Sequence, residues 1–144
     1  MGRKGFTLIE ILLSLALIGI ITTISIPVLQ SFLSRNDLDV TSQTFVQSLR
    51  RAQCLAEGCQ SDSKWGVKIQ TGNITIFRGD SYANRETDDD ESFDVSAGVT
   101  TSGLSEIVFS KLSGVPLSSG VTNINSSQGE TKIITTNEKG IASY

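Results

Sequence analysis

Histidine is absent from this 144-residue chain, and its absence excludes several kinds of chemistry. Histidine is the commonest metal ligand and general base, and it activates the nucleophile in serine–histidine and cysteine–histidine pairs. Isolated Ser, Lys and Asp residues are abundant, but no spacing links them into a nucleophile with its base. The sequence therefore predicts no catalytic site and no cofactor, and it disfavours an anchored enzyme or a solute-binding domain.

Charged residues are rare in the first 33 positions, and in the rest of the chain acidic residues outnumber basic ones. Only Arg3 and Lys4 of the 12 basic residues, and only Glu10 of the 15 acidic residues, precede position 34. Residues 34–144 therefore carry ten basic and fourteen acidic residues, a net charge of −4. A surface that binds polyphosphate is usually basic, so this balance argues against a general nucleic-acid-binding surface.

The most distinctive feature present is an apolar run from Phe6 to Ile26, in which Glu10 is the only charged residue. About 20 apolar residues suffice for a helix to cross a bilayer. Arg3 and Lys4 precede the run, and basic flanks stay in the cytoplasm, so the rest of the chain should face outward. A secretory signal has small residues after its apolar core, whereas here the small residue, Gly5, precedes the core.

The stretch KGFTLIEILLSLALIGII (residues 4–21) resembles the N-terminus of type IV pilins and type II secretion pseudopilins. The resemblance implies that Met1–Gly5 is a leader, cut after Gly5 on the cytoplasmic side by a prepilin peptidase. It also implies that the new N-terminus, Phe6, is methylated and that the subunit polymerises with copies of itself and other pilins on an inner-membrane assembly platform. The expected location is a single-pass inner-membrane precursor, and afterwards a filament at the cell surface or in the periplasm.

The same resemblance assigns roles to Glu10 and Pro27. Glu10 should pair with the free N-terminal amine of a neighbouring subunit and so set the axial register, because each charge is costly alone in an apolar environment. The alternative is that Glu10 reaches the membrane interface without a partner. Pro27 removes a backbone donor and should kink or locally melt the helix, the alternative being that it ends the span.

A second helical segment is predicted by apolar residues at Leu38, Phe45, Leu49, Ala52 and Ala56, which share one helix face that Val46 widens. We expect one long helix from Phe6 to about Glu57, with a weak point or restart at Ser34–Asp37 and a stop at Gly58. The expected segments are a leader (1–5), a membrane or filament-core helix (6–27), its amphipathic continuation (28–57) and a β-rich outer domain (58–144).

Beyond Gly58 the apolar residues alternate with a period of two, which predicts strands. A hairpin is expected from Trp65–Gln70 and Asn73–Gly79 around a tight turn at Thr71-Gly72. A second turn is expected at Asn137–Gly140. The remaining predicted strands are Ser92–Val95, Glu106–Ser110, Val121–Asn125, Glu130–Thr136 and Gly140–Tyr144. The predicted fold class is α+β, a long helix packed against an antiparallel sheet or small β-sandwich.

The outer part also resembles the H-type pseudopilin and FimT-like subfamily, through LRRAQCLAEG, WGVKI, ITIFRG and SYA. This resemblance leaves two alternatives to a pilus subunit: a minor pseudopilin of a type II secretion system, or a DNA-uptake pilin. For DNA the candidate side chains are Arg50, Arg51, Arg78 and Arg85. They are scattered among acids with no basic or aromatic stripe, so DNA binding is the disfavoured alternative.

Two further clusters have a functional and a plain interpretation. Cys54 and Cys59 are too few for a zinc site; outside the cytoplasm they form a disulfide if the helix stops near Glu57, or else remain two buried thiols. The carboxylates of RETDDDESFD are calcium candidates or a solvated acidic loop, and the run lacks the spacing of an EF-hand. The calcium candidates are Asp88, Asp89, Asp90 and Glu91.

Overall fold

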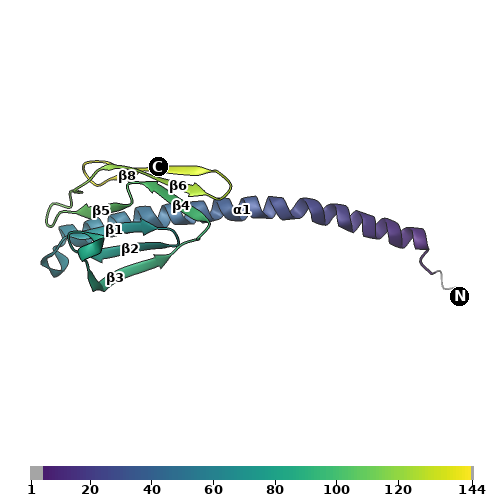
Figure 1. The fold of residues 1–144 in the computed structure, drawn as a ribbon, viewed down its shortest axis with the longest axis horizontal. Helices are drawn as coiled ribbons and strands as arrows, with labels where there is room; N and C mark the ends of the chain where they lie inside the picture. Colours follow the sequence, from purple (N-terminus) through teal and green to yellow (C-terminus); the bar gives the residue numbers. More distant parts are fainter. Residues whose placement is uncertain (1–4, 144) are drawn as a thin grey trace. The chain divides into compact units, whose positions relative to one another are not determined.

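Figure 1 shows one long helix followed by two β-sheets. The structure is a computed structural model that describes residues 5–143, with the side chains at positions 24–27 outside the description. Helix α1 (Leu8–Glu57) is continuous over 50 residues, so the predicted helix is confirmed from two residues after Phe6 to its expected end at Glu57. Contacts divide the chain into two compact units, Met1–Leu33 and Ser34–Tyr144, and each is described by itself.

The predicted restart at Ser34–Asp37 is wrong, because α1 continues through these residues, and a weak point there stays a prediction. Their polar side chains are used by contacts within the second unit and do not cap a new helix. The Ser34 hydroxyl lies 2.5 Å from the Ser126 hydroxyl, and Arg35 forms an ion pair with Glu130 at 2.7 Å. Side chains that could cap a helix therefore form tertiary contacts here instead.

Within residues 5–143, eight strands follow α1 and form two four-stranded antiparallel sheets, and two short 3₁₀ turns connect elements between them. In the first sheet the order is β3-β2-β1-β5, and in the second it is β4-β6-β7-β8. The strands are β1 (Trp65–Gln70), β2 (Asn73–Arg78), β3 (Glu86–Asp94), β4 (Val99–Gly103), β5 (Glu106–Phe109), β6 (Gly120–Ser126), β7 (Thr131–Thr136) and β8 (Ala142–Ser143). The 3₁₀ turns are η1 (Gln60–Asp62) and η2 (Tyr82–Asn84). The α+β class and the antiparallel sheets are confirmed.

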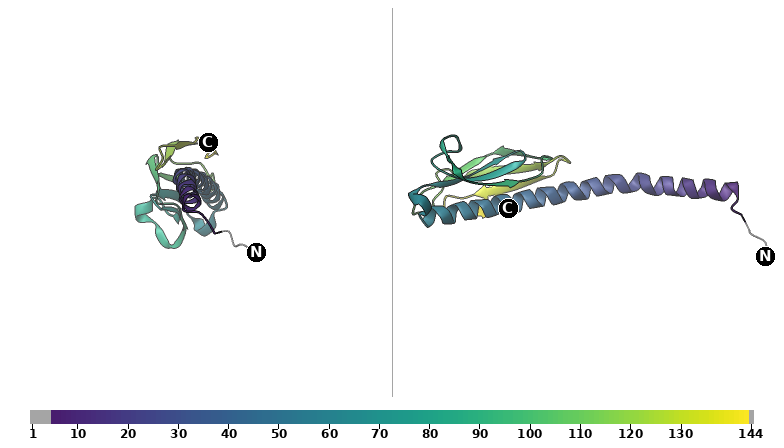
Figure 2. Two further views of the ribbon diagram at one scale, coloured as in Figure 1. Left: turned by 90° about the vertical axis from the view of Figure 1, so that its right-hand side faces the viewer. Right: turned by 90° about the horizontal axis from the view of Figure 1, so that it is seen from below.

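One hydrophobic core joins the second half of α1 to both sheets. Figure 2 shows this half of the helix running along the sheets. All six residues of the predicted helix stripe are buried: Leu38, Phe45, Val46, Leu49, Ala52 and Ala56. The first sheet contributes the inward side chains of β1, β2 and β5, including Trp65, and the second contributes Ile124 and Ile134. Burial of these faces is the main driving force that holds the helix and sheets together.

Two strand predictions fail in this unit. The acidic run was expected to be a loop up to Ser92, but β3 begins at Glu86 and includes all of it. Cross-strand pairing with β2 and ion pairs with arginines compensate for the low β propensity of Asp and Glu. The sequence of β4, VTTSG, was not predicted as a strand, although it pairs with β6 along its full length.

Gly66 on β1 is required by close packing of the first sheet. A Cβ atom at this position would lie 2.5 Å from Cζ of the buried Phe77 and 3.0 Å from the Ile107 carbonyl oxygen. We expect Gly66→Ala to lower the free energy of unfolding by about 1–3 kcal/mol, the usual cost of overpacking. Thermal unfolding measures this loss, and Gly98→Ala is the matched control, since only the Ser96 hydroxyl lies near its added Cβ, at 3.5 Å. Equal stability of both variants would contradict the packing argument.

Candidate functional site

The first turn of α1 holds the segment that the sequence singled out. Thr7 precedes the helix and caps it: its Oγ1 accepts a bond from the Glu10 N–H at 3.4 Å, and its carbonyl accepts from the N–H groups of Glu10 and Ile11. Thr7 and Glu10 stand three residues apart, which is the spacing of a capping box. The T-x-x-E pattern of Thr7–Glu10 is the sequence signal for this role of Thr7, which was not predicted.

Glu10 projects from this turn as an exposed carboxylate, and among residues 5–143 no basic side chain forms an ion pair with it. A carboxylate near the N-terminus of a helix is favoured by the helix dipole. That placement stabilises the charge within one chain, and it leaves the side chain available to a second molecule.

From Leu8 to Ile21 the helix carries mostly large apolar side chains. The large side chains of residues 8–21 are exposed, and the segment passes the length and composition test for crossing a membrane. Its hydroxyls bond back to their own helix: Ser14 to the Glu10 carbonyl at 2.7 Å and Thr23 to the Gly19 carbonyl at 2.7 Å. Such bonds satisfy polar groups without an external partner, so the segment suits an apolar environment.

Parts of the predicted maturation site lie outside the described residues. Met1–Lys4 are not described, whereas Gly5 and Phe6 are, and both precede the helix without regular structure. The side chain of Pro27 is also outside the description. Helix α1 continues beyond position 27, so the helix does not end there, and a kink at Pro27 stays a prediction.

The two cysteines flank the end of α1. Cys54 is exposed on the last turns, Cys59 is half-buried just beyond the helix, and both are free thiols in the structure. The plain interpretation, two thiols packed in the core, is therefore wrong for Cys54. The helix does stop at Glu57, and Cys59 adopts a left-handed conformation with φ of 53°. The disulfide between Cys54 and Cys59 stays a prediction.

The acidic strand β3 is neutralised in part by arginines from α1, from β2 and from the segment directly before β3. Arg78 of β2 pairs with Asp89 at 2.9 Å, Arg85 with Asp90 at 2.7 Å, and Arg51 of α1 with Glu91 at 2.6 Å. Within residues 5–143 no three carboxylate, cysteine or histidine side chains are grouped to hold a metal ion. The calcium candidates thus serve largely as partners of arginines.

The arginines considered for DNA are mostly occupied by these same pairs. Hydrogen bonds to Glu91 and to Asp90 raise the pKa of Arg51 and of Arg85, respectively, above their ordinary values. Both guanidinium groups are therefore charged and committed to carboxylates at neutral pH. Arg85 also lies over the ring of Tyr82, 3.9 Å from its centroid. Three of the four candidates thus form no free basic surface.

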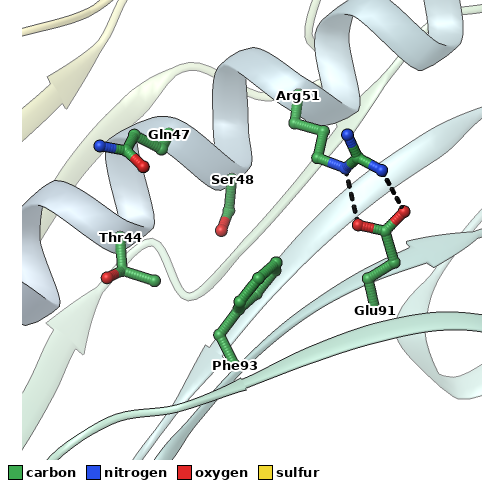
Figure 3. Close-up of a pocket in the computed structure, with 6 residues that line it drawn as sticks. All are labelled: Thr44, Gln47, Ser48, Arg51, Glu91 and Phe93. Atoms are coloured by element: carbon green, nitrogen blue, oxygen red, sulfur yellow. Dashed lines mark hydrogen bonds and ion pairs between the residues drawn. The ribbon is translucent and has the colours of Figure 1, made fainter.

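A groove lies between α1 and the edge strand β3, and it has a volume of about 450 Å³. Figure 3 shows Thr44, Gln47, Ser48 and Arg51 on the helix side, with Glu91 and Phe93 on the strand side. Arg51 donates two bonds to Glu91, from Nε at 2.6 Å and from Nη2 at 2.7 Å. The ring of Phe93 points toward the helix and remains 37% exposed. The groove has no signal in the sequence, because it arises only when β3 pairs beside the helix.

The described residues thus combine two features. The first half of α1 is apolar with one acid near its start, and the second half of α1 shares a hydrophobic core with the β-sheets. A family description, "Prokaryotic N-terminal methylation motif", matches residues 1–26. The chain is similar to "Type IV major fimbrial protein FimA" of Dichelobacter nodosus, 33% identical over 86 residues that cover 59% of this chain and 54% of the relative. It is also similar to "Fimbrial protein" of Moraxella nonliquefaciens, 31% identical over 78 residues covering 49% and 50%, respectively. The chain spans about half the length of the curated relatives it matches.

Among solved structures the fold is similar to the minor pseudopilin EpsH from the type 2 secretion system of Vibrio cholerae. The TM-score is 0.56 at 17% identity, and the match covers 74% of this chain and 94% of EpsH. Together the motif, the fimbrial relatives and the shared fold support the type IV pilin and pseudopilin family.

Proposed function

We propose that this chain is a structural subunit that polymerises through its N-terminal helix into a type IV pilus-like filament. The observation that carries the proposal is the methylation motif over residues 1–26, placed on an apolar helix with a single acid, Glu10. Members of this family are structural subunits, which agrees with the missing catalytic constellation in the sequence.

The physics of the helix supports storage in a membrane before assembly. The exposed apolar side chains of residues 8–21 need an apolar environment, and lipid supplies it in the precursor. In a filament, helices of neighbouring subunits supply the same environment, so the apolar surface stays buried in both states. The precursor is anchored in the inner membrane with the β-rich unit outside, according to the basic residues Arg3 and Lys4.

Maturation follows from the motif. A prepilin peptidase cuts between Gly5 and Phe6 and methylates the amine of Phe6, and an inner-membrane platform then extracts the subunit. In the filament Glu10 faces the N-terminal amine of a neighbour, which compensates two charges that would each be costly alone. The exposed carboxylate of Glu10, which forms no ion pair among residues 5–143, supports such an intermolecular pair.

The test is mass spectrometry of the mature chain isolated from its native cell. We expect a chain that begins at Phe6, lacks five residues and carries one additional methyl group on its N-terminus. The matched control is the chain expressed in a host without a prepilin peptidase, which should retain Met1–Gly5. A native chain that still begins with the leader would overturn the proposal.

A further inference from the structure

We propose that the free edge of β3 is a docking site for an extended, basic strand of a partner protein. β3 is the last strand on one side of the first sheet, whose order is β3-β2-β1-β5. Edge strands present unpaired backbone groups, which bind extended segments by adding a strand to the sheet. This role is separate from assembly through the N-terminal helix.

The backbone of β3 shows which groups are available. The Val95 N–H bonds to the Gly72 carbonyl on β2's side at 3.1 Å. Alternate residues of an antiparallel strand direct their backbone groups to opposite sides. In the regular register opposite Asn73–Ile76, Ser92 and Asp94 therefore direct their N–H and C=O groups away from β2, toward the free edge.

The groove beside this edge has the shape that an added strand would fill. The side chains of Glu91 and Phe93 face α1 and form one wall, and Thr44 and Ser48 lie opposite (Figure 3). A strand paired with Ser92 and Asp94 would place alternate side chains over this groove. It would cover the Phe93 ring, which is the most accessible large apolar side chain of the first sheet's strands.

The charge of the edge selects the partner. Arginines neutralise Asp89, Asp90 and Glu91, whereas no ion pair involves Glu86, Asp88 or Asp94 in the described part of the chain. The last three are exposed, so the edge keeps a net negative charge. A second copy of β3 would be repelled, and an extended segment with Lys or Arg at alternate positions would be attracted. The acidic run thus prevents self-pairing and still admits a basic partner.

The experiment measures binding of labelled peptides to the full chain in a non-ionic detergent, with empty micelles as the blank. The probe is a twelve-residue peptide of alternating Lys and Val. A Lys–Pro peptide of equal length and charge is the control, because proline favours a polyproline helix over a strand. We expect saturable binding of the Lys–Val peptide below about 1 mM and at least roughly tenfold weaker binding of the Lys–Pro peptide. Equal binding of the two peptides, or no binding, would overturn the proposal.

Variants of the edge locate the site. Ser92→Pro removes one outward N–H and should weaken binding about tenfold, whereas Ser92→Ala keeps the N–H and should bind as the parent does. Unchanged binding by Ser92→Pro would overturn the proposal. If Ser92→Pro does not fold, the double variant Glu86→Lys/Asp88→Lys decides: its preference should shift from the Lys–Val to a Glu–Val peptide. A preference that stays with Lys–Val would show that binding occurs elsewhere.

Discussion

Replacing Glu10 with alanine should abolish filaments while leaving the chain inserted in the membrane and cut after Gly5. Insertion depends on the apolar run, which the substitution lengthens, so no loss is expected there. In the proposed filament, assembly depends on the pair between Glu10 and the amine of a neighbour, so the substitution should leave that amine without a counter-charge. Electron microscopy of the cell exterior measures filaments, and membrane fractionation measures insertion.

The size of this effect follows from burial. Breaking a buried ion pair by removing one partner typically costs about 3–5 kcal/mol. At each subunit contact this corresponds to roughly two to four orders of magnitude in the association constant. Because a filament repeats the contact at every step, the loss applies to every addition. Glu10→Gln keeps the size of the side chain and removes only the charge, so it should fail as Glu10→Ala does.

Ser14→Ala is the matched control for this prediction. Ser14 lies one turn further along and donates its hydroxyl to the Glu10 carbonyl, a bond within a single helix. Its removal changes the same turn without changing charge, and we expect normal filaments. Normal filaments from Glu10→Ala would contradict the pairing, and filaments from Glu10→Gln alone would show that shape, not charge, sets the register.

The helical half of this fold could be predicted from the sequence because its signals are local. The apolar run depends only on composition, and the stripe from Leu38 to Ala56 depends only on helical spacing. The polar positions on that helix were harder. Thr41, Ser42 and Ser48 are buried beside the stripe, and the Ser42 hydroxyl bonds back to the Leu38 carbonyl at 2.7 Å. The hydroxyl of Ser42 can be buried because it bonds its own backbone, which a hydropathy pattern does not show, whereas the buried Thr41 hydroxyl has no partner among the described residues.

The acidic strand could not be predicted, because its partners come from distant parts of the chain. Arg51 lies 40 residues before Glu91, and only the folded unit brings them together. The four consecutive acids Asp88–Glu91 would favour a loop if no arginines lay beside them. In the folded unit Arg51, Arg78 and Arg85 do so. The same nonlocal pairing creates the groove at Phe93. Local sequence thus predicted the long helix and several strands, whereas the surface of the second unit required the structure.

The stability of the second unit, Ser34–Tyr144, can be measured in the full chain. Trp65 is the only tryptophan, it is 2% exposed, and it belongs to the same core as the helix stripe. Its ring nitrogen donates to the Gln60 carbonyl at 3.1 Å. Unfolding of the second unit should therefore change the fluorescence of Trp65. The apolar N-terminal part of the helix, held in its micelle, contributes no tryptophan signal.

With this reporter, Phe45→Ala should lower the free energy of unfolding by about 3–5 kcal/mol, the usual cost of deleting a buried phenylalanine. Phe45 is 0% exposed. It belongs to the stripe on α1 and lies in the core that this helix shares with both sheets. Since small domains have about 5–15 kcal/mol of stability in total, this loss would be a large fraction of the stability of the unit. Phe93→Ala is the matched control, because its ring is 37% exposed and leaves no closed cavity. A loss for Phe45→Ala no larger than that for Phe93→Ala would mean that the second half of α1 does not share the core of the sheets.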